Sequence, residues 1–134
     1  MLHIDLGKLG KRVIIAGIKP YYTPKEITGK SIVVVVNLKP VKIRGITSNG
    51  MLLAAADSKG TVVLLNPGDT SPGSEVTVKG VFKKPVSILE LEDFKKIELL
   101  IDEFGKATYN KKVLRTEKTE IVSDKSVEKG AKIL

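Results

Sequence analysis

The sequence contains no cysteine and a single histidine, His3. Without cysteine there can be no disulfide bond, no thiol nucleophile and no thiolate metal site. One histidine cannot build a histidine-rich zinc site, and it argues against a Ser-His-Asp catalytic triad. We therefore interpret His3 as a strand residue rather than a metal ligand, and we expect no cofactor and no bound metal.

Long apolar runs and tryptophan are also missing. No apolar stretch reaches about 18 residues, so we expect no transmembrane helix and no association with a membrane. Residues 1–13 lack the basic-then-apolar pattern of a signal peptide, which favours a cytoplasmic location. With 134 residues, of which 42% are hydrophobic and 28% charged, the chain can bury a core of its own.

Acidic residues are scarce in the first part of the chain. Residues 1–56 hold nine basic against two acidic residues, a net charge of +7, whereas residues 57–134 hold 14 against 13, a net charge of +1. An excess confined to one segment predicts a basic face, and therefore a polyanionic partner such as nucleic acid. A solvated lysine-rich surface of the kind found in thermophilic proteins gives the same composition, so charge alone leaves both interpretations open.

The first half of the chain reads as short strands. The unbroken β-branched run at residues 31–36 predicts a central strand that is buried on both faces. Thr23 and Glu26 form a capping box with Pro24 at the first helical position, which predicts a short helix to about Ile27. The other expected strands lie at residues 12–17, 50–57, 61–65 and 75–78, with a turn at 57–60 that makes a hairpin.

The second half predicts one amphipathic helix followed by a hairpin. The helix starts at a capping box over residues 87–90 and ends near Gly105. Strands at residues 113–116 and 119–122 then pair with each other. Five apolar residues at helical spacing form the stripe that we expect in the core: Leu91, Phe94, Ile97, Ile101 and Phe104.

Several residues that invite a functional interpretation are better explained by packing. We expect Met51 to fill the core. Tyr21 and Tyr22 could stack on bases, but packing of the short helix onto the barrel is favoured. Asp102 and Glu103 lie on the polar side of the expected helix, and we do not interpret them as a catalytic pair.

Residues 37–51, NLKPVKIRGITSNGM, form the segment with the most chemistry. In an extended chain, Lys42 and Arg44 would point to the same side. Uncharged donors close by can bind phosphate oxygens, ribose or a base edge. The segment therefore predicts a loop that follows a phosphate backbone, although an ordinary barrel corner with solvated lysines remains the alternative. Its basic and polar candidates are Lys39, Lys42, Arg44, Ser48 and Asn49.

The segment from Asn37 to Ala55 closely resembles the signature of a tRNA-binding domain family. The family occurs in methionyl-tRNA synthetases, at the C-terminus or in the β-subunit, in free-standing tRNA-binding proteins and in synthetase cofactors of the endothelial monocyte-activating polypeptide II type. Its pattern runs N-L-K-P-x-K-x-R/M-G-x-x-S-x-G-M-x-x-A-A. The matching positions are Asn37, Leu38, Lys39, Pro40, Lys42, Arg44, Gly45, Ser48, Gly50, Met51, Ala54 and Ala55.

Weaker matches extend the resemblance over residues 1 to about 79. Val13–Ile18 is similar to a family strand, Tyr21–Ile27 to a family helix and Pro72–Val76 to a closing turn. The resemblance implies a mainly β fold, an oligonucleotide-binding (OB) barrel. The family's usual first strand has no counterpart before Leu2, so the resemblance implies a barrel that is incomplete there and has an unpaired strand edge.

The end of the chain is similar to the C-terminal extension of the monocyte-activating polypeptide type. The similarity rests on Ala107–Tyr109, the hairpin that follows and residues 130–134. It implies two parts: residues 1–79 as the tRNA-binding domain, and residues 80–134 as an extension that packs on the barrel. Because the extension imitates the second subunit of dimeric relatives, we expect a monomer.

The resemblance implies a non-catalytic module that retains or delivers tRNA for an aminoacyl-tRNA synthetase, in particular the methionyl enzyme, in cis or in trans. These residues contain no ATP-binding signature, which argues against catalysis by the chain itself. A protein-interaction or cytokine-like module of a synthetase complex is the alternative. The expected tRNA-binding residues are Lys39, Lys42, Arg44, Ser48, Asn49, Lys11, Arg12 and Lys19.

Overall fold

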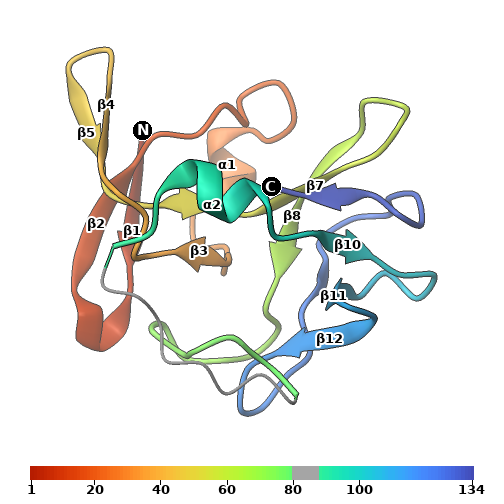
Figure 1. Cartoon of the computed structure of the whole chain (residues 1–134). Helices are drawn as coiled ribbons and strands as arrows, with labels where there is room; N and C mark the ends of the chain where they lie inside the picture. Colours follow the sequence, from red (N-terminus) through yellow and green to blue (C-terminus); the bar gives the residue numbers. More distant parts are fainter. Residues whose placement is uncertain (80–87) are drawn as a thin grey trace.

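The computed structural model describes residues 1–79 and 88–134, and it is mainly β (Figure 1). Within these residues two short helices, α1 (Pro24–Ile27) and α2 (Leu91–Lys95), and a 3-10 turn, η1 (Gly7–Leu9), join the strands. The strands before residue 80 are β1 (Leu2–Asp5), β2 (Lys11–Ile14), β3 (Val34–Val35), β4 (Val41–Ile43), β5 (Ile46–Ser48), β6 (Met51–Leu52), β7 (Ala54–Ala56), β8 (Val62–Asn66) and β9 (Thr77–Val78). Those after residue 87 are β10 (Leu99–Ile101), β11 (Ala107–Tyr109), β12 (Lys112–Arg115), β13 (Val122–Ser123) and β14 (Lys132–Ile133).

The largest sheet is built from both parts of the chain. Its antiparallel strands follow the order β13-β8-β7-β14-β10-β11-β12-β9, so strands from before and after residue 80 lie next to one another. Ile133 pairs with Ala55 where β14 meets β7, and Ser123 pairs with Leu65 where β13 meets β8. All of these except the half-buried Ser123 belong to the same buried core cluster. The C-terminal strands therefore complete a sheet and core that the first part begins.

In the described part of the chain, three two-stranded ladders lie outside this sheet: β1–β2, β3–β6 and β4–β5. The predicted hairpin at residues 57–60 joins β7 to β8 and is confirmed. Asp57 organises the turn, because its Oδ1 accepts hydrogen bonds from the amides of Lys59 and Thr61, each at 3.0 Å. Gly60 supplies the positive φ, 83°, that this turn requires.

The predicted capping box is confirmed at the start of α1. The Glu26 amide donates to Thr23 Oγ1 at 3.2 Å, and the Thr23 amide donates to Glu26 Oε1 at 3.1 Å. His3 lies on β1 and is a strand residue, as predicted. Met51 packs against the core cluster, which confirms its predicted packing role.

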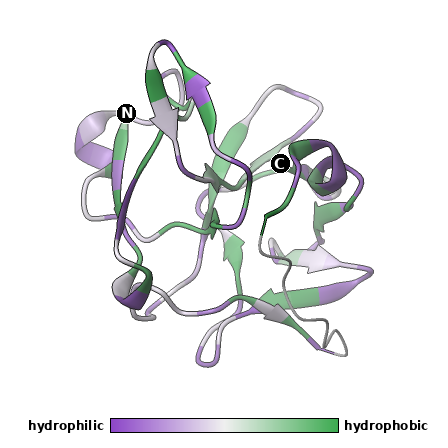
Figure 2. Ribbon diagram, turned by 60° about the vertical axis from the view of Figure 1, so that its left-hand side comes forward, coloured by the Kyte–Doolittle hydropathy of each residue, from purple (hydrophilic) through white to green (hydrophobic). Residues whose placement is uncertain are grey.

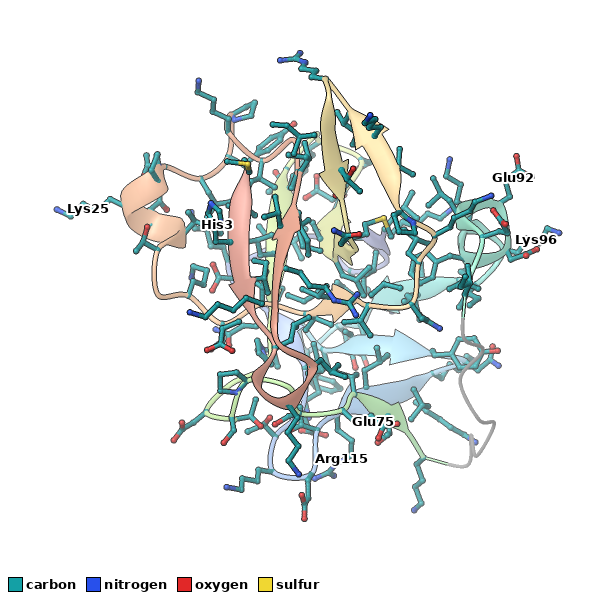
Figure 3. All side chains as sticks on the ribbon, turned by 90° about the vertical axis from the view of Figure 1, so that its left-hand side faces the viewer. His3, Lys25, Glu75, Glu92, Lys96 and Arg115 are labelled. Carbon is teal, nitrogen blue, oxygen red and sulfur yellow. The ribbon has the colours of Figure 1, made fainter. Side chains whose placement is uncertain are left out.

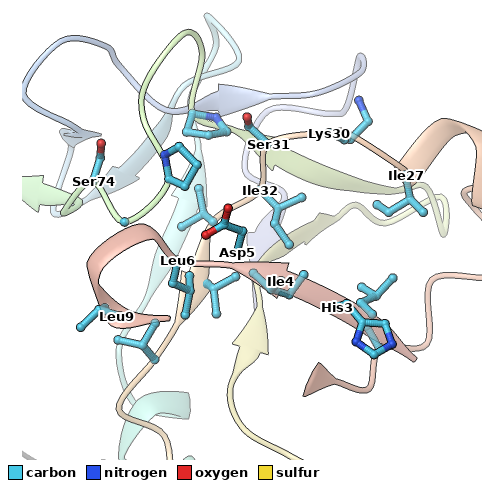
Figure 4. A pocket seen from close by; sticks show the side chains of 18 of the residues that line it. His3, Ile4, Asp5, Leu6, Leu9, Ile27, Lys30, Ser31, Ile32 and Ser74 are labelled. Carbon is cyan, nitrogen blue, oxygen red and sulfur yellow. The ribbon is translucent and has the colours of Figure 1, made fainter. Parts of the chain in front are cut away.

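The run at residues 31–36 forms a shorter strand than the sequence predicts. Only Val34–Val35 joins a ladder, and only Val33 is buried. Burial of the whole run on both faces is therefore wrong. The physical reason is that β3 pairs with β6 alone, while residues 30–37 border a large apolar groove that Figure 4 shows from close by.

The prediction of an amphipathic helix over residues 91–104 is wrong. The helix ends at Lys95, and Leu99–Ile101 forms β10, paired with β11 and β14. Phe94 and Ile101 are buried as expected, but Ile97 is 39% and Phe104 74% exposed. Pairing with the neighbouring β11 and the distant β14 buries alternate residues of β10, which outweighs the local 3.6-residue periodicity.

The start of this helix also differs from the expectation. Glu90 is its N-cap and makes no side-chain capping bond, while Ser87, the other end of the expected capping box, lies outside the described residues. The expected strands at 113–116 and 119–122 do meet in a tight hairpin, since the Ile121 amide donates to the Leu114 carbonyl at 2.9 Å. Ladder strand β13, however, starts at Val122 and pairs with β8 instead.

A polar cluster around Tyr22 fastens the C-terminal segment to the first part of the chain. The buried Tyr22 hydroxyl donates to Asp124 Oδ2 at 3.1 Å and accepts from the Leu64 amide at 3.0 Å. Lys30 Nζ lies 2.9 Å from Asp124 Oδ1, whose side chain is only 7% exposed. Burial raises the pKa of the Tyr22 hydroxyl, so it stays protonated and donates. The packing interpretation of Tyr22 is confirmed.

Replacing Asp124 with the isosteric Asn should lower the free energy of unfolding by about 1.5–3 kcal/mol, because Lys30 loses its buried anion and the Tyr22 hydroxyl loses a charged acceptor. Urea denaturation of full-length Asp124→Asn would measure it. The control is Glu103→Gln, which removes an exposed ion pair with Lys129 at 3.5 Å and should cost less than about 1 kcal/mol. Equal costs for the two variants would contradict the role assigned to this cluster.

Candidate nucleic-acid interface

The β4–β5 hairpin stands out from the body of the molecule in both Figure 1 and Figure 3. Its strands pair with Ile43 opposite Ile46. Arg44 and Gly45 form the two-residue turn with φ of 51° and 80°. Positive φ at both central positions is what a type I′ turn needs, and this turn matches the twist of the flanking strands. The chain is therefore not extended at Arg44, and the expectation that placed Lys42 and Arg44 on one side on that ground is wrong.

Ser48 anchors the base of this hairpin to Ile15, the residue that follows β2. Its buried hydroxyl accepts a hydrogen bond from the Ile15 amide at 3.0 Å and donates to the Gly50 carbonyl at 3.3 Å. The next residue adds a backbone bond, from the Asn49 amide to the Val13 carbonyl at 3.0 Å. The Ser48 side chain is thus used inside the protein, which does not support its predicted role as an RNA contact.

Arg12 closes the hairpin segment at both ends. Its Nη1 donates to the carbonyl of Val36, where the segment begins, and to the carbonyl of Asn49, where it ends, the latter at 3.4 Å. Arg12 is half-buried. Its guanidinium satisfies backbone acceptors that the ladders leave unpaired. We therefore assign Arg12 a positioning role rather than the direct RNA contact that its charge suggests.

Gly50 marks the point at which the chain returns to the core. Its φ is 140°, and a Cβ atom there would lie 3.0 Å from the Val35 carbonyl oxygen. The position therefore requires glycine, both for conformation and for space.

A cleft of about 580 Å³ lies at the base of the hairpin. It brings Lys11 and Arg12 of β2 together with Pro40 and Asn49 from the two ends of the hairpin segment. The remaining lining residues are Val13, Val36, Asn37, Leu38 and Ile88. Lys11 is exposed. Of the predicted contacts, Lys11, Arg12 and Asn49 thus meet in one place beside the hairpin.

The other predicted cations are all exposed but not all neighbours. Lys42 and Arg44 belong to the hairpin, and neither has an acidic partner within the described residues. Lys39 precedes the hairpin, with its Nζ 3.7 Å from Glu90 Oε1 in a well-exposed pair. Lys19 is separate from this group, because it lines the apolar groove instead.

The apolar groove has a volume of about 1,390 Å³ and runs between β1 and residues 30–37 (Figure 4). Ile4 and Leu6 lie on one side and Ile32 on the other, and Val34 also lines the groove. In the described parts of the chain, no three His, Asp or Glu side chains gather as a metal site would require. The same parts hold no helix whose length and apolarity would let it cross a bilayer.

Asp102 and Glu103 have structural roles. Asp102 Oδ1 accepts hydrogen bonds from the amides of Phe104 and Lys106, each at 2.9 Å, and so shapes the turn after β10. Glu103 forms the exposed ion pair with Lys129.

The sequence interpretation overlooked three aliphatic side chains of the hairpin. Val41, Ile43 and Ile46 are 47%, 38% and 40% exposed. Their alternation with Lys42 and Thr47 could have revealed them, since alternate residues of a strand face opposite sides.

Comparison with known proteins gives the interface a family context. Residues 1–75 match the family model described as "Putative tRNA binding domain". Similar sequences include the methionine–tRNA ligases of Clostridium perfringens, 53% identical over 76 residues, and of Thermotoga maritima, 51% identical over 76 residues. These alignments cover 56% and 57% of this chain but only 12% of each ligase, so the chain corresponds to a small part of those enzymes.

Among solved structures, the C-terminal domain of Plasmodium vivax p43 superimposes with a TM-score of 0.85 at 24% identity. The match covers 97% of this chain and 81% of that domain. It extends past the family match at residue 75 into the C-terminal segment. The mainly β, OB-type fold that the sequence predicts is confirmed.

Replacing Arg12 with Met should loosen the hairpin, because two carbonyls lose their donor. A loss of about 1–3 kcal/mol corresponds to amide exchange about 5- to 150-fold faster in residues 41–48. Hydrogen exchange followed by mass spectrometry would measure it. Lys11→Met removes the neighbouring cation, which makes no such bond among those described, and should leave the exchange unchanged. Identical exchange in both variants would show that Arg12 does not hold the hairpin.

Proposed function

The chain belongs to the tRNA-binding domain family, and we propose on that basis that it binds tRNA through the β4–β5 hairpin and the cleft at its base. The observation that supports this proposal most is the position of the cations. Lys42 and Arg44 stand on a projecting hairpin, and Lys11 lines the adjoining cleft. Exposed cations without acidic partners are free to replace the counterions of a phosphate backbone.

Recognition would depend on the shape of the folded RNA. Compact RNA is bound through phosphates, 2′-hydroxyls and exposed loops rather than through a groove code. Only 4% of the residues are aromatic. Tyr22 is buried, whereas Tyr21 is 41% exposed. OB barrels usually hold an extended single-stranded nucleic acid by stacking its bases on aromatic rings. Few such rings are exposed here, so a single strand should bind weakly.

We further propose that the module retains or delivers tRNA for an aminoacyl-tRNA synthetase, in particular the methionyl enzyme. The similar segments belong to methionine–tRNA ligases, which supports this assignment. A binding module that acts in cis or in trans raises the local concentration of tRNA near the catalytic body and needs no catalytic group of its own. With that role it would work in the cytoplasm.

The C-terminal segment supports a monomer. Strands β13 and β14 pair with β8 and β7, so those strands are not left for a second copy. We propose residues 1–79 as the tRNA-binding part and residues 80–134 as its extension, of which the described part, residues 88–134, packs on residues 1–79 through these strands.

tRNA should bind more tightly than single-stranded DNA of equal length, since the interface supplies charge but few stacking rings. Filter binding at two salt concentrations would compare total tRNA, single-stranded DNA and duplex RNA. Each phosphate contact should contribute about 0.7–0.9 to the slope of log K against log salt. Equal affinity for all three ligands at physiological salt would rule out recognition of tRNA.

Arg44→Asn should weaken tRNA binding by about 5- to 150-fold, or about 1–3 kcal/mol, and make its salt dependence shallower. Asn tolerates the positive φ at this position well, so the turn should keep its stability while it loses its charge. The matched control is Lys112→Asn on β12, which lies at the opposite end of the molecule from the hairpin in Figure 1. An unchanged dissociation constant for Arg44→Asn, or an equal loss in both variants, would contradict the proposed site.

A further inference from the structure

The hairpin has one aliphatic side and one hydrophilic side. Val41 and Ile43 alternate with Lys42 along β4, and the register places Ile46 directly opposite Ile43, on the same side. Figure 2 shows apolar and hydrophilic colours alternating along this hairpin. All three aliphatic side chains are more than a third exposed. Aliphatic residues gathered on one side of a projecting element are available to a ligand.

The charges that the hairpin segment itself carries are of one sign, while Glu90, the N-cap of α2, pairs with Lys39 from outside it. Residues 37–56 contain no Asp or Glu, whereas Lys39, Lys42 and Arg44 all fall within them. Protein partners usually present mixed charges and apolar side chains, and nothing acidic on the hairpin would answer a partner's cations. A ligand that combines dense negative charge with flat apolar surfaces fits better, and RNA with unstacked bases has both properties.

We propose, on the premise of the proposed function, that the aliphatic side of the hairpin packs against unstacked loop bases of folded tRNA. Ile43 and Ile46 form its centre, with Val41 beside them. Aliphatic side chains of this kind insert between or cover bases in other nucleic-acid complexes. Arg44, in the turn at the tip of the hairpin, then lies at the phosphates that flank these bases. Contact with loop bases makes the hairpin a reader of tertiary RNA shape and not only of charge.

The hairpin is rigid enough for this role. Arg12 holds both of its ends, and Ser48 fastens its base to the Ile15 amide. Its turn has the conformation that suits a tight hairpin. A surface ordered before binding does not lose that conformational freedom when it binds.

The test replaces both central residues, Ile43→Thr with Ile46→Thr, in the full chain. Threonine keeps the β-branched shape that a strand favours and removes most of the aliphatic surface. The dissociation constant for tRNA should rise about tenfold or more, as expected for losing contact with one or two bases. The salt slope should stay unchanged, because no cation is removed. Phe104→Ser, which removes a 74% exposed apolar residue outside the hairpin, is the control and should bind as the unaltered chain does.

A second readout uses the RNA. Chemical probing of backbone flexibility at saturating protein should show altered reactivity at loop nucleotides with the unaltered chain and with Phe104→Ser, but not with the double variant. Equal thermal melting of the three proteins would establish that all are folded. If the double variant melts early, the single variant Ile46→Thr replaces it, with the same expected direction.

The outcomes separate this inference from the function it rests on. If the unaltered chain does not bind tRNA, the proposed function fails. If it binds tRNA and the double variant binds equally well with the same loop reactivity, the aliphatic contact is overturned and the function stands. The double variant could also keep its tRNA affinity but lose binding to methionyl-tRNA synthetase, measured by pull-down. That result would assign the aliphatic side to a protein partner and would also overturn the inference.

Discussion

The candidate interface depends on the hydrogen bonds that one guanidinium makes with two carbonyls far apart in the sequence. Arg12 joins the carbonyls of Val36 and Asn49, and between these two residues the chain leaves the body, forms the hairpin and returns. Ser48 and Gly50 act at the same junction. The Ser48 hydroxyl accepts a hydrogen bond from the Ile15 amide, and Gly50 has no Cβ atom that would crowd the Val35 carbonyl oxygen. By bonding these carbonyls, Arg12 sets the direction of the hairpin. The hairpin in turn exposes Lys42 and Arg44.

The body that carries the hairpin is held together by pairing between distant segments. Strands β13 and β14 add to the edges of β8 and β7, and Asp124 connects the C-terminal segment to Tyr22 and Lys30. Each unpaired strand edge covered in this way is one less surface for unwanted association. The core that results supports the hairpin without using its exposed side chains, which leaves these free to meet a ligand.

The features of the fold and the site that could be predicted from sequence are those whose sequence pattern is complete within a few neighbouring residues. The α1 capping box and the turn at residues 57–60 are complete within a few residues, and both predictions are confirmed. The helix over residues 91–104 failed because Leu99 and Ile101 are buried by strands more than 30 residues away, β14 among them. The site was predicted as a set of charged and polar residues. Composition could not distinguish Arg12 and Ser48, which the fold uses internally, from Lys42 and Arg44, which it exposes.

The absence of cysteine allows a direct test of where tRNA lies. Single-cysteine variants of the full chain, each labelled with a short photo-crosslinker, would be irradiated with tRNA at physiological salt. Val41→Cys on the aliphatic side of the hairpin and Thr47→Cys on its hydrophilic side should crosslink to tRNA, whereas Lys112→Cys on β12 and Lys59→Cys in the β7–β8 turn should not. Crosslinks from β12 or the β7–β8 turn, with none from the hairpin, would contradict the account.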